Sequence, residues 1–295
     1  MIYTVTFSPA IDYFLDFNDL ELGKINHAHK VNIVSGGKGI NVSKVLSNFG
    51  MESIALGYVG GKTCDLFIKG LNEYQNIKTD FIKIKEDTRI NVKINTPIES
   101  ALDAPNPNID KEEEKKLFLK LDKLNKDDIV VFSGEFPINF NKELYLNALK
   151  KFNNKGIKFI IDTSNEILLD SLKYHPFFIK PNIEELSSFF HKDISFIEEA
   201  KIYGDKLIEL GALNVLISLG KDGAIFVSKN EKIYQKSPQI DVISTVGAGD
   251  TMVASFIYSY LLDNDFAKAL AFSIKASSLT CKLGRLVKKE DINDY

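Results

Sequence analysis

The chain has 295 residues, with 37 lysines and arginines against 40 aspartates and glutamates, and a formal net charge of −3. This balance gives no reason to expect nucleic acid or an anionic membrane as a partner. Hydrophobic residues make up 44% of the chain, yet no apolar run approaches the roughly 20 residues of a membrane span. We therefore expect a globular enzyme with one large core and, by default, a cytoplasmic location.

The start of the chain and its cysteines give no sign of a secreted, disulfide-linked or zinc-binding protein. Residues 1–6 read as a strand and not as a signal peptide, because they lack a basic leader and a long apolar segment. Cys64 and Cys281 are two residues far apart in the sequence, which suggests neither a disulfide framework nor a zinc site.

The first hundred residues predict a small sheet beside the main one. Alternating patterns predict strands at Tyr13–Phe17, Ala28–Val34 and Arg89–Ile94, and helical spacing marks Ile40–Phe49. We expect a lid, built from about residues 12–34 and 88–103, that covers a cleft and excludes water during group transfer. The Pro-rich and Asn-rich segment 103–108 is the best linker candidate.

From about residue 111 onward, short apolar runs alternate with helical patterns, which is typical of βαβ units and a parallel sheet. Binding groups of parallel strands lie at their carboxyl ends, so one rim of this sheet should carry the site. The expected strands are Ile129–Ser133, Ile157–Asp162, Phe177–Lys180, Val215–Leu219 and Ala224–Val227, and the rim residues are Ser133, Asp162, Lys180, Ser218 and Gly220.

A glycine-rich turn near the C-terminus is the most informative motif. Residues 239–243 alternate as an edge strand would, and residues 250–262 have helical spacing, so the turn should open a helix. Backbone N–H groups of Gly247, Ala248 and Gly249 could then face a phosphoryl group. Asp250 is a candidate catalytic base, or else the N-cap of the helix.

Three further groups of residues suit phosphate chemistry. Close backbone approach at Gly37, a point charge from Lys38 and an amide from Asn41 suit a hydroxylated, phosphorylated ligand, although a turn that begins a helix has the same pattern. Arg89, one of two arginines, offers a planar fork for a phosphate, or a solvated surface charge. A carboxylate at position 185 with the amide of residue 182 suits hydrated Mg²⁺, or an ordinary capping box.

In order along the chain, these motifs resemble the ribokinase-like sugar kinases called the PfkB family. The resemblance covers essentially the whole chain, and its branch is the one that contains 1-phosphofructokinase and tagatose-6-phosphate kinase. It is carried by residues 4–12, 36–43, 88–92, 180–185 and 218–220 and by the Gly-Ala-Gly-Asp turn at 247–250.

The resemblance implies a single ribokinase-like domain over residues 1–295, folded as a three-layer α/β/α sandwich with a mostly parallel central sheet and a small β-sheet lid. It implies a homodimer formed through the lid, with ATP and Mg²⁺ as cofactors. The implied activity is ATP-dependent phosphorylation of a ketohexose phosphate. Fructose 1-phosphate, giving fructose 1,6-bisphosphate, is the first acceptor; tagatose 6-phosphate, or sugar-phosphate binding without turnover, is the alternative.

The resemblance also implies a role for each site residue. Asp250 acts as the base, and Gly247, Ala248 and Gly249 form the anion hole for the transferred phosphoryl group. Asn182 and Glu185 organise the metal ion. The acceptor is held by Asp12, Gly37, Lys38, Asn41, Arg89, Asn91 and Ser133, and ATP by Lys180, Asn182, Ser218, Gly220, Gly223 and Thr245, together with Gly247 and Gly249.

Three residues depart from the pattern of this branch and concern the acceptor. Ser8 replaces an asparagine, and His27 replaces an arginine after Asn26. The usual Ser-Gly-Ser-Leu-Pro turn carries Glu135 where a small hydroxyl is common. A carboxylate close to a bound phosphate repels it, unless Glu135 turns away or meets a lysine.

Overall fold

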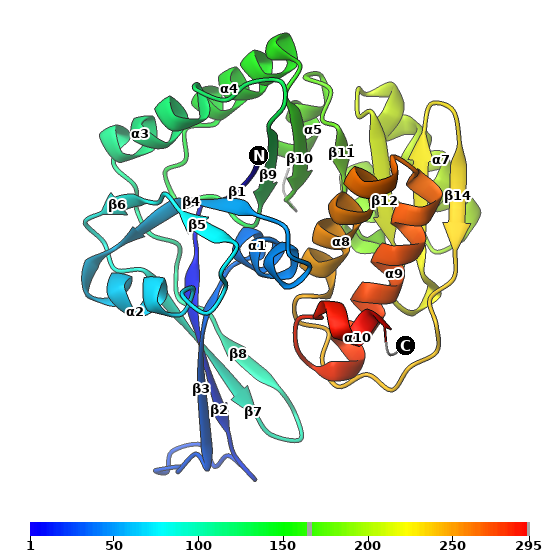
Figure 1. The fold of residues 1–295 in the computed structure, drawn as a ribbon. Coiled ribbons are helices and arrows are strands. Elements are labelled where there is room, and N and C mark those ends of the chain that lie inside the picture. The colour runs from blue at the N-terminus through cyan, green and yellow to red at the C-terminus, as the bar shows by residue number, and fades with distance from the viewer. Residues whose placement is uncertain (164–166, 294–295) are drawn as a thin grey trace.

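A mostly parallel sheet forms the centre of the computed structural model, which describes residues 1–163 and 167–293 (Figure 1). Its order in the described residues is β14-β13-β12-β11-β10-β9-β1-β4-β5, with β6 also paired to β4; only the β12–β13 and β13–β14 pairs are antiparallel. The strands are β1 (Ile2–Thr6), β4 (Ser53–Gly60), β5 (Ile77–Thr79), β6 (Ile82–Ile84), β9 (Ile129–Ser133), β10 (Lys158–Asp162), β11 (Phe178–Ile179), β12 (Asn214–Ser218), β13 (Ala224–Ser228) and β14 (Lys232–Gln235).

Helices cover both faces of this sheet, as the alternation along its strands requires. Ile129 and Val131 of β9 pack in the core with α1 (Lys38–Asn48), α8 (Ala248–Asp263) and α9 (Phe266–Leu283). Val130 and Phe132 pack in the core on the other face. That face is covered by α3 (Lys111–Leu121), α4 (Lys142–Lys155), α5 (Ile167–Leu172), α6 (Ile183–Phe190) and α7 (Ile197–Glu209). The predicted three-layer α/β/α sandwich is confirmed.

A four-stranded sheet projects from this body (Figure 1). It comprises β2 (Ala10–Asp16), β3 (Lys30–Gly36), β7 (Arg89–Asn95) and β8 (Ser100–Leu102), in the order β3-β2-β7-β8. Four short helices complete the elements of the described residues: α2 (Cys64–Lys69), α10 (Lys289–Asn293) and two 3₁₀ turns, Gly61–Thr63 after β4 and Gly220–Asp222 after β12. None of the helices in the described residues is both long and apolar enough to cross a membrane.

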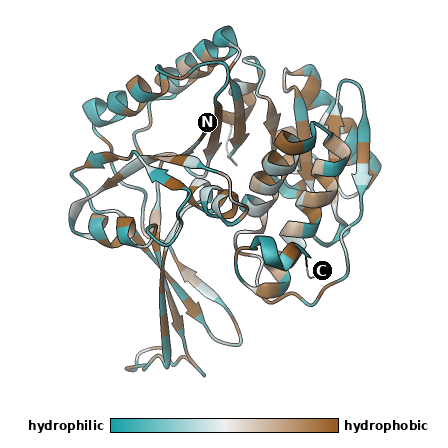
Figure 2. Ribbon diagram, viewed as in Figure 1, coloured by the Kyte–Doolittle hydropathy of each residue, from teal (hydrophilic) through white to brown (hydrophobic). Residues whose placement is uncertain are grey.

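The two faces of the small sheet differ in chemistry. Tyr13 of β2 lies beside Ile33 of β3 and Val92 of β7, whereas Asp12 lies beside Val34 and Asn91. Because side chains alternate along a strand, one face is apolar and the other polar. The apolar face carries Ile11, Tyr13, Leu15, Val31, Ile33, Ile90, Val92, Ile94 and Leu102, and Figure 2 shows hydrophobic residues along these strands. Val31, Ile33 and Leu102 are 50%, 43% and 60% exposed.

One expected strand is absent from the structure, and one observed strand was not expected. Residues 239–243 form no strand; instead the N–H groups of Ile243 and Ser244 bond to the carbonyl of Cys281 near the end of α9. The glycine turn therefore follows irregular backbone. The central strand β4 was not predicted, because almost all of its residues are buried and its apolar run does not alternate.

Candidate active site

The site lies where the carboxyl ends of the central strands meet. Strand β1 pairs with β4 on one side and β9 on the other, so the chain order diverges around it. Thr6 lies beside Ser133, and Ser133 lies beside Asp162. Asn182 forms a parallel bridge with Ser218 farther along the rim. The expected rim residues thus follow one another along one edge of the sheet.

Asp250 occupies the first turn of α8. The N-cap of this helix is Gly247, in the left-handed conformation (φ 78°), so the N-cap role considered for Asp250 is wrong. Asn41 Nδ2 donates a hydrogen bond to Asp250 Oδ2 at 2.8 Å. This bond joins the N-terminal turns of α1 and α8, and the positive ends of the two helix dipoles lie together.

Burial raises the pKa of Asp250 to about 6, and the nearby Asp162 carboxylate adds to the shift. The hydrogen bond from Asn41 and the charges of Lys38 and Lys180 oppose it. Asp250 is only 6% exposed. The result is a carboxylate that is ionised at neutral pH yet basic enough to accept a proton from a hydroxyl.

The raised pKa of Asp250 should make the free energy of unfolding depend on pH. Between pH 3.8 and about 6 the folded chain holds a proton on Asp250 that the unfolded chain has released, so stability falls as the pH rises through this window. The substitution Asp250→Asn removes the effect. We expect the free energy of unfolding of the variant, relative to that of the wild type, to rise by about 2 kcal/mol between pH 4 and pH 7. Urea unfolding of both proteins at several pH values measures it; a constant difference would contradict the raised pKa.

The glycine turn offers three unused backbone donors. Within residues 1–163 and 167–293, the N–H group of Gly247 has no acceptor, and neither do the N–H groups of Gly249 and Asp250 in the first turn of α8. Ala248 differs from the expectation, because its N–H donates to the carbonyl of Thr245 at 3.2 Å. A Cβ on Gly249 would lie 3.4 Å from Lys180 Nζ, so this ammonium faces the turn. An anion at the start of α8 would meet these donors and Lys180.

Two lysines, the buried Lys180 and the half-buried Lys38, balance the carboxylates of the site. Lys180 Nζ lies 3.2 Å from Asp162 Oδ1, with both side chains almost fully buried. Asp162 also raises the pKa of Lys38, against the effect of burial, and Asp250, Glu185 and Glu135 add to this rise. Lys38 therefore stays charged beside the first turn of α1, which has Gly37 (φ 116°) as its N-cap.

The polar face of the small sheet presents Asp12 and Asn91. Asn91 Nδ2 donates to Asp12 Oδ1 at 3.1 Å, while the N–H of Ala104 donates to the Asn91 side-chain oxygen. Burial raises the pKa of Asp12, and the bond from Asn91 opposes the rise. A Cβ at Gly36 would lie 2.0 Å from Asp12 Oδ2, so glycine leaves the space that this carboxylate fills. Asn91 positions Asp12 and is itself 7% exposed.

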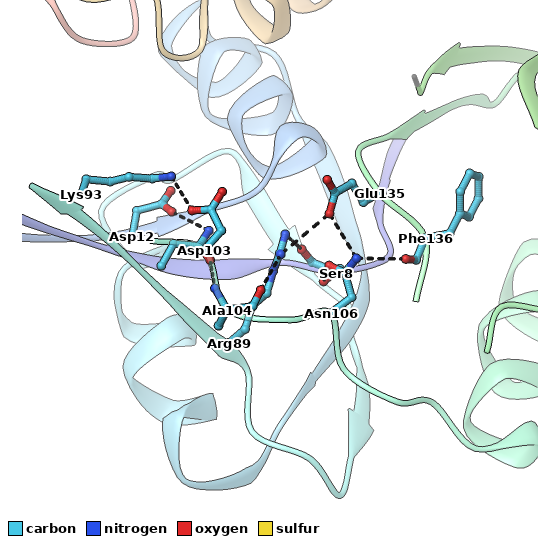
Figure 3. A network of polar contacts seen from close by, with 10 residues as sticks. Ser8, Asp12, Arg89, Lys93, Asp103, Ala104, Asn106, Glu135 and Phe136 are labelled. Carbon is cyan, nitrogen blue, oxygen red and sulfur yellow. Dashed lines mark hydrogen bonds and ion pairs between the residues drawn. The ribbon is translucent and has the colours of Figure 1, made fainter. Parts of the chain in front are cut away.

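Arg89 is held by backbone carbonyls at the base of the small sheet (Figure 3). Its Nη1 donates to the carbonyl of Ala104 at 3.1 Å and its Nη2 to that of Ser8 at 3.3 Å. Glu135 Oε2 lies 3.9 Å from Nη1. The fork is thus fixed in orientation and faces a carboxylate.

Some of the residues expected to bind ATP and the metal ion already make contacts within the fold, and the others are accessible to a ligand. Asn182 and Glu185 form a capping box of α6, with bonds of 2.7 and 2.9 Å between the side chain of each and the backbone N–H of the other. Gly223 lies against the backbone of β14, where a Cβ would meet the carbonyl of Gln235 at 2.0 Å. Ser218, Gly220 and Thr245 remain partly or fully exposed.

Ser133 and His27 are not placed for direct contact with a ligand. Ser133 is fully buried, and its hydroxyl has no hydrogen-bond partner among the described residues. His27 lies in the loop between β2 and β3, at the end of the small sheet that points away from the body (Figure 1).

Asn106 is a site residue that the sequence did not reveal. It lies in the segment expected as a linker, which connects β8 to α3 as irregular backbone. Its side chain accepts a bond from the Ser8 hydroxyl at 2.7 Å and donates to Glu135 Oε2 at 3.1 Å. No local pattern indicates such contacts, because the partners are separated by 98 and 29 positions.

Known proteins share both the sequence and the fold. The 1-phosphofructokinase of Borreliella burgdorferi is 38% identical over 294 residues, covering 99% of this chain and 95% of that protein. The D-tagatose-1-phosphate kinase of Bacillus licheniformis is 34% identical over 281 residues, covering 95% and 92%. The crystal structure of phosphofructokinase-2 from Escherichia coli in complex with substrates and products superposes with a TM-score of 0.93 at 25% identity, covering 99% and 97%. Residues 5–286 match the sequence pattern of the pfkB family carbohydrate kinases, and the chain belongs to this family.

Proposed function

We propose that this chain transfers the γ-phosphoryl group of ATP to a ketohexose phosphate, with fructose 1-phosphate as acceptor and fructose 1,6-bisphosphate as product. The observation that carries the proposal is the buried Asp250, held by Asn41 beside the unused N–H groups of α8. A base and an anion site thus share one helical turn. The family and the high identity to a 1-phosphofructokinase support the same reaction.

In this reaction the acceptor hydroxyl loses its proton to Asp250 as its oxygen bonds to the γ-phosphorus. The bond from phosphorus to the β,γ-bridging oxygen breaks, and ADP leaves. The N–H of Gly249 and the ammonium of Lys180 stabilise the charge on the phosphoryl oxygens during transfer. Fixed donors of this kind favour the transition state over the ground state.

The acceptor is assigned to the opening between the small sheet and the start of α1. Asp12 is fixed by Asn91 and accepts hydrogen bonds from sugar hydroxyls. Arg89 and Lys38 supply positive charge for the phosphate that the acceptor already carries. The ATP site extends along the rim past Ser218 and Gly220.

Mg²⁺ neutralises phosphate charge in reactions of this class. No cluster of three or more His, Cys, Asp or Glu side chains suited to a metal is present in the parts of the chain that the structure describes. Mg²⁺ commonly takes only one or two protein carboxylates. Since the capping box occupies the Asn182 oxygen and one oxygen of Glu185, the other oxygen of the Glu185 carboxylate would hold the hydrated ion.

Turnover with a panel of acceptors tests the proposal. ATP consumption is measured with fructose 1-phosphate, tagatose 6-phosphate, tagatose 1-phosphate and fructose 6-phosphate, and products are identified by mass. We expect the highest kcat/KM with fructose 1-phosphate. A higher value with a tagatose phosphate would reassign the acceptor, and binding of sugar phosphates without turnover would replace the kinase with a binding protein.

The cytoplasmic location stays a prediction from composition.

A homodimer through the small sheet is part of the proposal. Its apolar face contains Val31, Ile33 and Leu102, all substantially exposed in a single chain. Exposed apolar patches of this kind mark association surfaces. A second copy that presents the same face covers both sheets in a two-fold arrangement.

The substitution Ile33→Asp tests the dimer. A charge in the middle of the apolar face should prevent association, because it would be buried without a partner. Light scattering should give a mass of twice 33.2 kDa for the wild type and 33.2 kDa for the variant. The control Ile138→Asp changes an isoleucine on the main body that is even more exposed, at 71% against 43% for Ile33, and should remain dimeric. A monomeric wild type at micromolar concentration would exclude the dimer.

A further inference from the structure

A network of four side chains links two of the departures from the family pattern, Ser8 and Glu135 (Figure 3). The Ser8 hydroxyl bonds to Asn106 Oδ1, and Asn106 Nδ2 bonds to Glu135 Oε2 at 3.1 Å and to the carbonyl of Phe136 at 3.2 Å. The same Glu135 oxygen lies 3.9 Å from Arg89. The carboxylate is therefore directed at the guanidinium by the half-buried Asn106 amide.

Few N–H groups of the Arg89 guanidinium are free to bind an anion. Backbone carbonyls of Ser8 and Ala104 each take one N–H and fix the plane of the fork. Its Nε is buried and has no hydrogen-bond partner in the described residues. Glu135 is the carboxylate that forms an ion pair with Arg89 within residues 1–163 and 167–293. An anionic ligand that approaches Arg89 meets this carboxylate first.

Glu135 is also electrostatically coupled to Lys38. Its charge contributes to the raised pKa of Lys38, and Gly134 lies beside the Lys38 side chain. Arg89 and Lys38 are the two cations assigned to the acceptor phosphate, so Glu135 acts on both. Unlike Arg89, whose side chain is 15% exposed, the Glu135 side chain is 65% exposed and can leave its position without unfolding its surroundings.

The geometry points to Glu135 as an internal anion that competes with the phosphate of the acceptor for Arg89 and so sets the affinity for the acceptor. This inference rests on the proposed function for the identity of the acceptor. The phosphate and the carboxylate compete for the same N–H groups of the guanidinium, and the exposed carboxylate turns into solvent when the phosphate binds. Glu135 thereby weakens the binding of any phosphate group at Arg89, including inorganic phosphate.

The test compares the wild type with Glu135→Gln, which keeps the hydrogen-bond acceptor for Asn106 and removes the charge. Calorimetric titration without ATP uses fructose 1-phosphate and inorganic phosphate as probes. We expect the Kd of both probes to fall by about two- to fivefold, the size typical of an exposed charge pair. The affinity of the variant should also decrease more steeply with salt, because its site carries one more positive charge.

The control is Glu198→Gln, which neutralises an exposed carboxylate on α7 that is paired with Lys201. It should leave both Kd values and their salt dependence unchanged. Equal unfolding midpoints for the wild type and Glu135→Gln exclude a change in folding. An unchanged or weaker affinity in Glu135→Gln would overturn the inference, as would a wild type and a variant that bind neither probe.

Measuring turnover shows whether a negative result concerns the role of Glu135 or the kinase activity itself. Tighter phosphate binding by Glu135→Gln, together with no turnover of any acceptor by the wild type, would support the internal anion and refute the kinase. Normal turnover with equal Kd values in the two proteins would refute the internal anion alone.

Discussion

The substitution Asp250→Asn is expected to lower kcat by at least about 10²-fold. Asparagine keeps the size of the side chain and an oxygen that accepts the 2.8 Å bond from Asn41, so the first turn of α8 keeps its geometry. It removes the group that accepts the proton of the attacking hydroxyl. The KM values for ATP and for the acceptor should change little, because the loss concerns the transition state.

A matched substitution controls for the change of an aspartate in this helix. Asp263→Asn lies at the other end of α8, where the aspartate pairs with Lys268 at 3.6 Å. It should keep full activity. Steady-state kinetics of both variants measure the difference, and a kcat for Asp250→Asn within a factor of a few of the wild type would remove Asp250 from the role of base.

The second large effect is expected for Arg89→Ala, which should raise the acceptor KM by about 10²-fold with little change in the KM for ATP. A charged, fixed fork is lost, and Glu135 then faces the phosphate without a compensating cation. Arg89→Lys should recover only part of the affinity, because an ammonium keeps the charge but not the planar fork.

The only other arginine provides the control. Arg285 pairs with Asp291 near the C-terminus, at 2.7 Å, outside the site. Arg285→Ala should leave both KM values unchanged. If Arg89→Ala altered the KM for ATP and not that for the acceptor, Arg89 would belong to the other half of the site.

The sequence was a good guide to residues that act through motifs. Lys180 was predicted at the rim of the sheet, and Asp250 at the start of a helix after a glycine turn, because both patterns can be recognised in a sequence. The role of Gly247 as N-cap was less visible. It depends on a left-handed backbone (φ 78°), which the sequence permits but does not require.

Contacts between distant segments were beyond the reach of patterns. Ser8 and Glu135 stood out as separate oddities, and their common partner Asn106 was assigned to a linker. The capping box of Asn182 and Glu185 was an open alternative, because the same spacing suits a metal site. Only the folded geometry decides which neighbour satisfies a polar group.

The two-faced small sheet limits how this chain can change in length. A slip of one residue in β2 would turn Asp12 to the apolar face and Tyr13 toward the opening that holds the acceptor. Ligand contact and association would then fail together. Single substitutions on either face can be tolerated. An insertion or deletion of one residue inside β2, β3 or β7, in contrast, should abolish both ligand binding and association.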